Sequence, residues 1–112
     1  VYEGSFVNGE RKGQGKMQYR SGNTYIGNWK MGEKEGKGEM YYSNGDVYVG
    51  NWVQGKKQGQ GNYQYGLGGE YEGQWHDDQR HGYGKLIHQD GRVFEGEFRR
   101  GLPLKQVSRK GG

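Results

Sequence analysis

The residue types and spacings that catalysis and metal binding require are scarce in this sequence. Its three histidines, His76, His81 and His88, lie five and seven positions apart, and this spacing matches no metal-ligand signature. The sequence contains no Cys, which removes the thiolate both as a ligand and as a nucleophile. We therefore predict no catalytic centre, no metal site and no cofactor, and we interpret the histidines as structural residues.

Glycine pairs followed by a lysine raise a second chemistry, phosphate binding. In Gly13-Gln14-Gly15-Lys16, however, the spacing of a phosphate-binding loop is absent and no Ser or Thr follows the lysine. No segment shows the 3.6-residue apolar period of the helix that such a loop precedes. Since similar glycine pairs recur along the chain, we interpret them as architectural.

The composition favours a single folded domain of unusual type. Of the 112 residues, 25 are Gly and one is Pro, without the three-residue period of collagen. Only 29% of the residues are hydrophobic, yet 14% are aromatic, which argues against plain disorder. A net charge of +4 is low for a nucleic-acid-binding protein, so we expect no nucleic-acid partner.

Features of secretion and membrane insertion are missing from the sequence. It has neither Cys nor an Asn-x-Ser/Thr sequon, which favours a reducing, cytoplasmic location. It begins Val1-Tyr2-Glu3, without an initiator Met or a signal peptide, so we expect a processed or truncated piece. No apolar run approaches the ~18 residues of a membrane-spanning helix.

Glycine and aromatic residues recur in register every 23 positions. The first aromatic column consists of Tyr2, Tyr25, Tyr48, Tyr71 and Phe94. A Gly stands two positions after each of these residues, and a Trp or Phe stands two positions after that Gly. These and the neighbouring columns contain 21 of the 25 glycines. We predict a repeat array over residues 1–101 and a basic tail or linker over residues 102–112. The units start near Tyr2, Tyr25, Tyr48 and Tyr71, with a partial unit at Phe94.

Each unit is predicted to form two short β-strands and two reversals. If residues 24–29 and 37–42 are strands, side-chain alternation puts Tyr25, Gly27 and Trp29 on one face of the first and Gly38, Met40 and Tyr42 on one face of the second. We expect a seven-residue turn over 30–36 and a hairpin turn at Ser43-Asn44-Gly45-Asp46. Burial of one unit's aromatic residues does not offset the entropy of ordering it, so neighbouring units must share their faces in a solenoid-like ribbon.

The same alternation predicts a strand register. Placing Tyr25 opposite Tyr42 sets Trp29 opposite Gly38, so that each large residue lies beside a glycine or another tyrosine. We therefore expect the strand glycines to be sockets for neighbouring indole rings. A one-residue slip brings Lys37 onto the aromatic face, which the free-energy cost of burying its charge opposes.

The columns combine into one recurring motif, Tyr25-x-Gly27-x-Trp29-x-x-Gly32-x-x-x-Gly36-x-Gly38, closing on Gly45. This motif resembles the MORN repeat (membrane occupation and recognition nexus), from Tyr2 to about Gly101. The resemblance implies an all-β fold, an elongated, twisted single antiparallel sheet of 23-residue β-hairpin repeats with an aromatic concave face. The departures from the pattern are Phe6, Asp78, His88 and Phe98.

The resemblance also implies a function. Repeats of this family carry no catalytic activity themselves. They serve as scaffolds in cytoskeletal and ciliary assemblies, as tethers at membrane junctions, or as accessory modules beside enzyme domains. We therefore expect a non-catalytic scaffold or protein-interaction module in a cytoskeletal or ciliary (axonemal) assembly, located in the cytoplasm on the cytoskeleton. Two alternatives stay open: a peripheral membrane module that binds anionic phospholipid, and the regulatory repeat region of a larger enzyme.

The aromatic face is the first candidate site. A partner helix or extended peptide is expected to lie along it, since aromatic anchors favour interface hot spots. The same rings can also form the core of the sheet alone, and both interpretations stay open. The residues of this face are Tyr25, Trp29, Tyr42, Tyr48, Trp52, Tyr65, Tyr71 and Trp75.

Two further candidates lie outside that face. Ile26, Tyr41 and Val49 replace polar residues on the opposite face and predict an apolar patch for docking or for a homo-oligomer contact, or else scattered surface residues. The turns at 30–36 and its equivalents are expected to line one edge of the ribbon with cations, either as a solvated edge or as a contact for lipid phosphates or acidic tails. These cations are Arg11, Lys12, Lys34, Lys56, Lys57 and Arg80.

Overall fold

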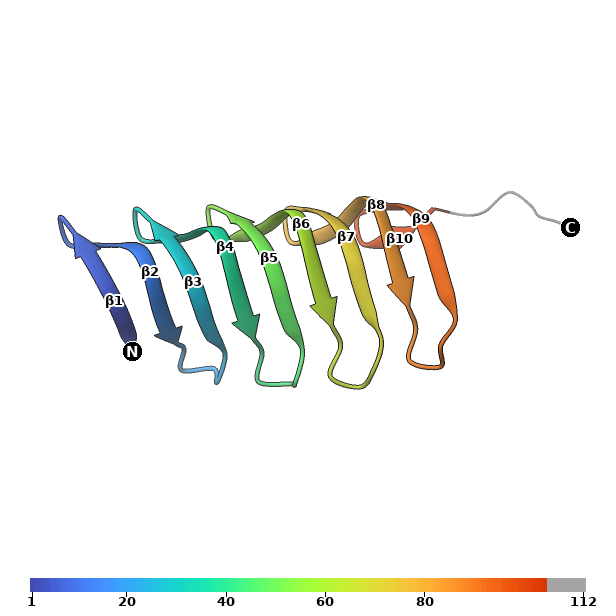
Figure 1. Cartoon of the computed structure of the whole chain (residues 1–112), viewed down its shortest axis with the longest axis horizontal. Coiled ribbons are helices and arrows are strands. Elements are labelled where there is room, and N and C mark those ends of the chain that lie inside the picture. Colours follow the sequence, from blue (N-terminus) through green and yellow to red (C-terminus); the bar gives the residue numbers. More distant parts are fainter. Residues whose placement is uncertain (105–112) are drawn as a thin grey trace, which may run out of the picture.

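The computed structural model describes residues 1–104, which form one antiparallel sheet of ten strands (Figure 1). Strand order in the sheet follows the order in the chain, so each strand pairs only with its sequence neighbours. The described residues include no helix, and hence none that is long and apolar enough to cross a membrane. The predicted all-β class and single antiparallel sheet of hairpin repeats are confirmed.

The strands come in alternating lengths, and together they give a ribbon of 60 × 24 × 16 Å. The strands are β1 (Tyr2–Val7), β2 (Glu10–Gln18), β3 (Thr24–Lys30), β4 (Glu33–Tyr41), β5 (Val47–Val53), β6 (Lys56–Gln64), β7 (Glu70–His76), β8 (Gln79–Ile87), β9 (Val93–Arg99) and β10 (Leu102–Pro103).

Two-residue turns form the hairpin tips, in place of the expected seven-residue turns. Between β3 and β4, Met31 and Gly32 have φ angles of 50° and 83°, the left-handed pair that a type I′ turn requires. The prediction of a turn over 30–36 was therefore wrong, because β4 already begins at Glu33. In the fourth tip the pair is Asp77 and Asp78, and aspartate tolerates this backbone region better than most residues.

A bulge in each long strand accounts for the residues assigned to the turn. The pairing passes from Gly27 opposite Gly38 to Trp29 opposite Lys34, so three residues of β4 face one residue of β3. Gly36 lies inside the bulge with φ of 85°, which a residue without Cβ adopts at no steric cost. The bulge bends the strand and places Lys34 over the aromatic rings.

The register differs from the predicted one by two residues. Tyr25 pairs with Met40 rather than with Tyr42, and on the other side Met40 pairs with Tyr48. The two-residue tip and the bulge set the pairing of Tyr25 with Met40, and the turn after β4, in which the Tyr42 amide donates to Asp46 O at 2.9 Å, sets the pairing of Met40 with Tyr48. Because a shift of two preserves the alternation of side chains, every residue stays on its predicted face.

The strand glycines form one row across the sheet, and tyrosine rings cover it. Gly38 pairs with Gly27 on one side and with Gly50 on the other. A Cβ atom on Gly38 would lie 2.5 Å from Tyr25 Cε1, and one on Gly27 would lie 2.7 Å from Tyr25 Oη. The sockets therefore accept phenol rings, and the expectation that they accept indoles was wrong.

The indoles instead hydrogen-bond to the glycine row. Trp52 Nε1 donates to Gly38 O at 3.2 Å, and Trp29 and Trp75 repeat this bond with the equivalent carbonyls. Tyr25 contacts Trp29 and Trp52 edge to face, with ring centroids 5.1 and 5.4 Å apart. The buried core consists of Tyr25, Trp29, Met40, Tyr48, Trp52, Tyr71, Trp75, Leu86 and Phe98.

Replacing one indole with a phenyl ring tests this bond. Trp52→Phe keeps an aromatic ring at the position but leaves Gly38 O without its donor and removes part of the ring volume. We expect the free energy of unfolding to fall by about 2 kcal/mol, measured by urea denaturation followed by circular dichroism. Trp29→Phe should give a similar loss, and an unchanged stability in both variants would contradict the role of the indole N–H.

The array extends beyond its predicted end. Leu102 and Pro103 pair with Arg99 and Phe98, and the Leu104 amide donates to Glu97 O at 2.8 Å. The predicted boundary after Gly101 is therefore corrected to include residues 102–104. The rest of the predicted tail or linker, residues 105–112, lies outside the described residues.

Candidate functional site

Most of the predicted aromatic face is core. The side chains of Tyr25, Tyr48 and Tyr71 are 0% exposed, and none of the three Trp residues exceeds 6%. These six rings cannot contact a partner while the sheet is folded, so their assignment to an open trough is corrected. Only Tyr42 and Tyr65 of the predicted set are half-buried and reach the surface.

Four of the predicted edge cations cover these rings instead of lining an edge. Arg11, Lys34, Lys57 and Arg80 lie in β2, β4, β6 and β8, because the hairpin tips are shorter than expected. Arg11 Cζ lies 4.7 Å from the Trp29 ring centroid, and Arg80 Cζ lies 5.3 Å from that of Phe98. Such contacts are cation–π interactions, which strengthen as the cation loses water. Of the six predicted edge cations, only Lys12 and Lys56 are exposed.

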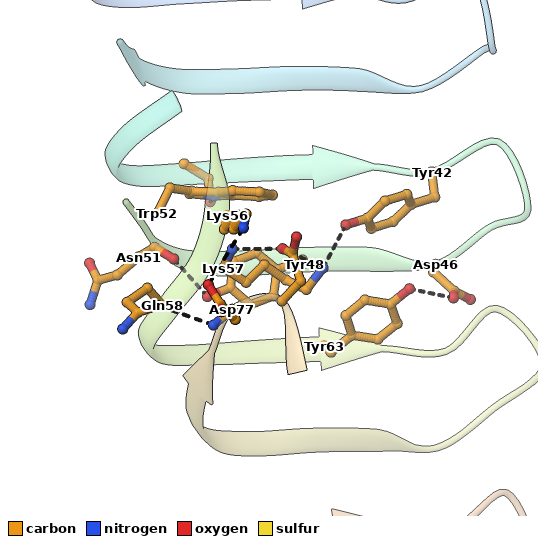
Figure 2. Close-up of polar contacts among 12 residues, drawn as sticks. Tyr42, Asp46, Tyr48, Asn51, Trp52, Lys56, Lys57, Gln58, Tyr63 and Asp77 are labelled. Atoms are coloured by element: carbon orange, nitrogen blue, oxygen red, sulfur yellow. Dashed lines mark hydrogen bonds and ion pairs between the residues drawn. The ribbon is translucent and has the colours of Figure 1, made fainter. Parts of the chain in front are cut away.

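Lys57 occupies the centre of this arrangement (Figure 2). Its side chain is 11% exposed, and Nζ donates to Tyr42 Oη at 3.3 Å. The Asp78 carboxylate lies 3.5 Å from Nζ and accepts a hydrogen bond from the Lys57 amide at 2.8 Å. Burial lowers the pKa of Lys57, while Asp78 acts in the opposite direction.

Arg80 repeats this arrangement one unit later. Its Nη1 donates to Tyr65 Oη at 3.4 Å, and its Nη2 donates to the Gly101 carbonyl. Arg11 makes the same backbone contact in the first unit, with Nη2 donating to Gly32 O at 2.7 Å. The cations therefore join neighbouring hairpin tips as well as covering rings.

Tyr63 belongs to the site, although the sequence analysis did not include it. Its hydroxyl donates to Asp46 Oδ2 at 2.6 Å (Figure 2), and its ring centroid lies 5.8 Å from that of Tyr42. Burial, and to a lesser extent this bond to a carboxylate, raises the pKa of Tyr63 well above its ordinary value. The signal in the sequence was a tyrosine in the column that holds Met40 and Leu86.

Most of these residues line an open depression on the aromatic side, and Tyr42 lies outside its lining but is joined to it by the hydrogen bond from Lys57. The depression has a volume of ≈ 270 Å³ and lies between Lys57 and Arg80, with Tyr63, Tyr65 and Asp78 in its lining. Hydroxyl groups, ring faces and cations meet there, a combination that suits binding of a peptide rather than bond-breaking chemistry. We name the set Tyr42, Lys57, Tyr63, Tyr65 and Arg80 the Tyr–cation groove.

The opposite-face patch is exposed but divided. Ile26, Tyr41 and Val49 are 41%, 40% and 46% exposed. Ile26 and Val49 both border a depression of ≈ 410 Å³, but Glu39 pairs with each of them and stands between them. Tyr41 lies to one side, where its hydroxyl donates to Glu39 Oε1 at 2.6 Å. A carboxylate therefore interrupts the predicted apolar patch.

The histidines are not assembled into a metal site. The rings of His76 and His81 are 5.5 Å apart, and Gln58 Nε2 lies 2.9 Å from His76 Nδ1. His88 is in the turn before β9, where its amide donates to Arg92 O at 2.7 Å. Within residues 1–104, no three His, Asp or Glu side chains are grouped to hold a metal ion.

Comparison with known proteins gives one result for the whole array. The sequence model of a family described as MORN repeat matches five successive segments, and together they span most of the chain. No curated protein sequence matched the chain. The matched segments are residues 2–24, 25–47, 48–68, 71–91 and 94–103.

Proposed function

The chain belongs to the MORN repeat family, a family of protein and membrane interaction modules, and on that premise we propose that it is a scaffold that binds a partner segment in the Tyr–cation groove. Repeats of this family are generally non-catalytic, and we propose the same for this chain. The setting that the family resemblance supports is a cytoskeletal or ciliary (axonemal) assembly in the cytoplasm.

One observation supports the groove above the other surfaces. Two half-buried tyrosines one repeat apart each accept a hydrogen bond from a cation, Tyr42 from Lys57 at 3.3 Å and Tyr65 from Arg80 at 3.4 Å. Two strand spacings separate the pairs by about 10 Å. That distance corresponds to about three residues of an extended peptide or seven residues of a helix. A partner with aromatic or acidic residues at that interval fits both pairs at once.

The membrane alternative has weaker support. A basic edge that binds anionic phospholipid needs cations that project into solvent. Arg11, Lys34, Lys57 and Arg80 instead lie over rings, and the exposed Lys56 pairs with Asp77 at 3.6 Å. The regulatory region of a larger enzyme is a further proposal, which the presence of a catalytic domain in the full-length chain would decide.

Affinity capture with paired variants tests the proposal. The wild-type chain, Tyr42→Ala/Tyr65→Ala and Ile26→Glu/Val49→Glu are immobilised and exposed to an axonemal extract. We expect the tyrosine variant to retain roughly a tenth or less of the captured axonemal protein, and the opposite-face variant to capture as much as the wild type. The reverse result assigns binding to the opposite face and rejects the groove.

A further inference from the structure

The hairpin tips stack on one another, and the fourth tip has an aspartate, Asp78, where the other tips have a glycine. The second tip residue donates its amide to the carbonyl of the cation one repeat earlier, Gly55 to Lys34 O at 3.0 Å and Asp78 to Lys57 O at 3.1 Å. The two junctions therefore have the same backbone geometry. They differ in two side chains: the second tip residue is glycine in one and aspartate in the other, and the first tip residue's amide donates to Glu35 Oε1 at 3.0 Å in one and to Gln58 Oε1 at 3.1 Å in the other.

This difference leaves the two lysines with different partners. Asp78 provides a carboxylate 3.5 Å from Lys57 Nζ. No ion pair within residues 1–104 includes Lys34, and no hydrogen bond from its ammonium is found there. The Lys34 Nζ atom lies 5.0 Å from the Trp52 ring centroid and 5.6 Å from that of Tyr19.

The Lys34 ammonium is partly desolvated yet reachable from outside. Arg11 Nε is the one buried side-chain nitrogen or oxygen without a partner in the described part of the chain. Lys34 Nζ also makes no hydrogen bond there, but it is not a buried atom without a partner, so it must reach the surface. Burial lowers the pKa of Lys34, which shows that its environment disfavours an unpaired charge. A carboxylate placed beside it relieves that cost.

We propose that Lys34 is the docking point for a carboxylate of an acidic peptide segment, which supplies from the partner what Asp78 supplies to Lys57 within the chain. This inference rests on the proposed function and extends it. It gives the chemistry of the partner segment and places its acidic residue at the junction of the second and third tips, one repeat before the Lys57 end of the Tyr–cation groove.

A peptide fits this position better than a phospholipid surface does. Lys34 lies half-buried between the rings of Tyr19 and Trp52, whereas Lys30 and Lys56 are exposed at the neighbouring tips. Both exposed lysines alternate along their strands with residues of the aromatic face and so point to the opposite face, which leaves a planar layer of headgroups no exposed lysine beside the recessed one. A narrow chain with a protruding carboxylate reaches it.

Gly55→Asp tests the proposal without altering Lys34. A Cβ atom at Gly55 meets nothing within 4 Å, and its φ of 82° is close to the 68° that Asp78 adopts. The new carboxylate should therefore pair with Lys34 as Asp78 does with Lys57. We measure binding of a fluorescein-labelled peptide of eight alternating Glu and Ala residues to the full chain by fluorescence anisotropy. Gly55→Asp should weaken it about tenfold.

Two further variants supply the comparison. Gly9→Asp introduces the same charge in the first tip, which has φ of 80° and open space but no preceding cation column, and it should bind within about twofold of the wild type. Asp78→Gly releases Lys57 and should strengthen binding severalfold. Circular dichroism of all three variants checks that each is folded.

Each of the following outcomes overturns the proposal. Equal binding by Gly55→Asp and the wild type removes Lys34 as the docking point, and equal weakening by Gly9→Asp reduces the effect to net charge. Binding to phosphatidylserine vesicles that Gly55→Asp abolishes, with no binding of the peptide, assigns Lys34 to lipid instead. Loss of axonemal capture in Tyr42→Ala/Tyr65→Ala together with normal peptide binding by Gly55→Asp keeps the groove and rejects the Lys34 inference alone.

Discussion

Gly38→Ala is expected to destabilise the sheet strongly for a change of one methyl group. The new methyl group would lie 2.5 Å from Tyr25 Cε1 and cannot move away, because Gly38 is paired on both sides with Gly27 and Gly50. Tyr25 cannot move either, since its ring is wedged between Trp29 and Trp52. We expect the free energy of unfolding to fall by about 3 kcal/mol or more, measured by urea denaturation.

Gly55→Asn is the matched control for this prediction. Gly55 has a φ of 82°, which asparagine adopts more readily than most residues, and open space around its Cβ position. We expect its stability to fall by no more than about 1 kcal/mol. If Gly38→Ala were as stable as Gly55→Asn, the tyrosine sockets would not be what holds the repeats together.

The position of the change along the array affects how far the damage spreads. Each strand pairs only with its sequence neighbours, and ring contacts such as Tyr25–Trp52 reach one strand further, so the array unfolds according to the stabilities of its units and of the interfaces between them. Gly38 lies between two complete repeats, and its loss weakens interfaces on both sides. Gly15→Ala, beside the first strand, should leave the later repeats folded and give a smaller loss of β signal.

The fold was largely predictable because its two main signals are local. Alternation in Thr24–Lys30 assigns Tyr25 and Trp29 to the same face whatever the neighbouring strand does. The recurrence of that segment every 23 residues then requires neighbouring units to share the face. Both features follow from side-chain period and spacing, and neither depends on the details of a turn.

The register was not predictable by the same means. It depends on the number of residues that a bulge absorbs, and the sequence marks the bulge only by a glycine, Gly36, that fits a turn equally well. Assigning residues 30–36 to a turn displaced the pairing of Tyr25 by two positions. An error of one position would have been visible, because it brings Lys37 to the core, but an error of two was not.

The candidate site shows the consequence of that error. The column that contains Lys34 and Lys57 was visible in the sequence, but the direction in which these side chains point was inferred from the assumed turn. In a two-residue tip the same residues lie inside a strand, and their side chains turn toward the rings. The cations therefore changed from an exposed edge to a cover over the core, and the rings that stay open to solvent at the groove are Tyr42, Tyr63 and Tyr65.

The array is expected to unfold cooperatively in alkaline solution between about pH 10 and pH 12. Burial raises the pKa of both Tyr42 and Tyr71 to about 12, and it raises the pKa values of Tyr25 and Tyr48 further above the ordinary value. Their folded pKa values exceed the unfolded ones, so this stabilisation is complete below pH ~10 and is lost as the pH rises toward the folded values. For the fully buried Tyr71 the loss amounts to about 3 kcal/mol.

The lysines act in the opposite direction but are outnumbered. Burial lowers the pKa values of Lys34 and Lys57, so the folded state gains stability as these groups lose their protons. The tyrosine contribution dominates because three buried phenols and the half-buried Tyr42 all have raised pKa values, against two lysines. We expect the tyrosinate absorbance to rise in the same narrow pH interval in which the β signal of circular dichroism disappears. Gradual ionisation near pH 10 with an unchanged β signal would mean that the rings are accessible to solvent, and the sockets would then not exclude water as the structure requires.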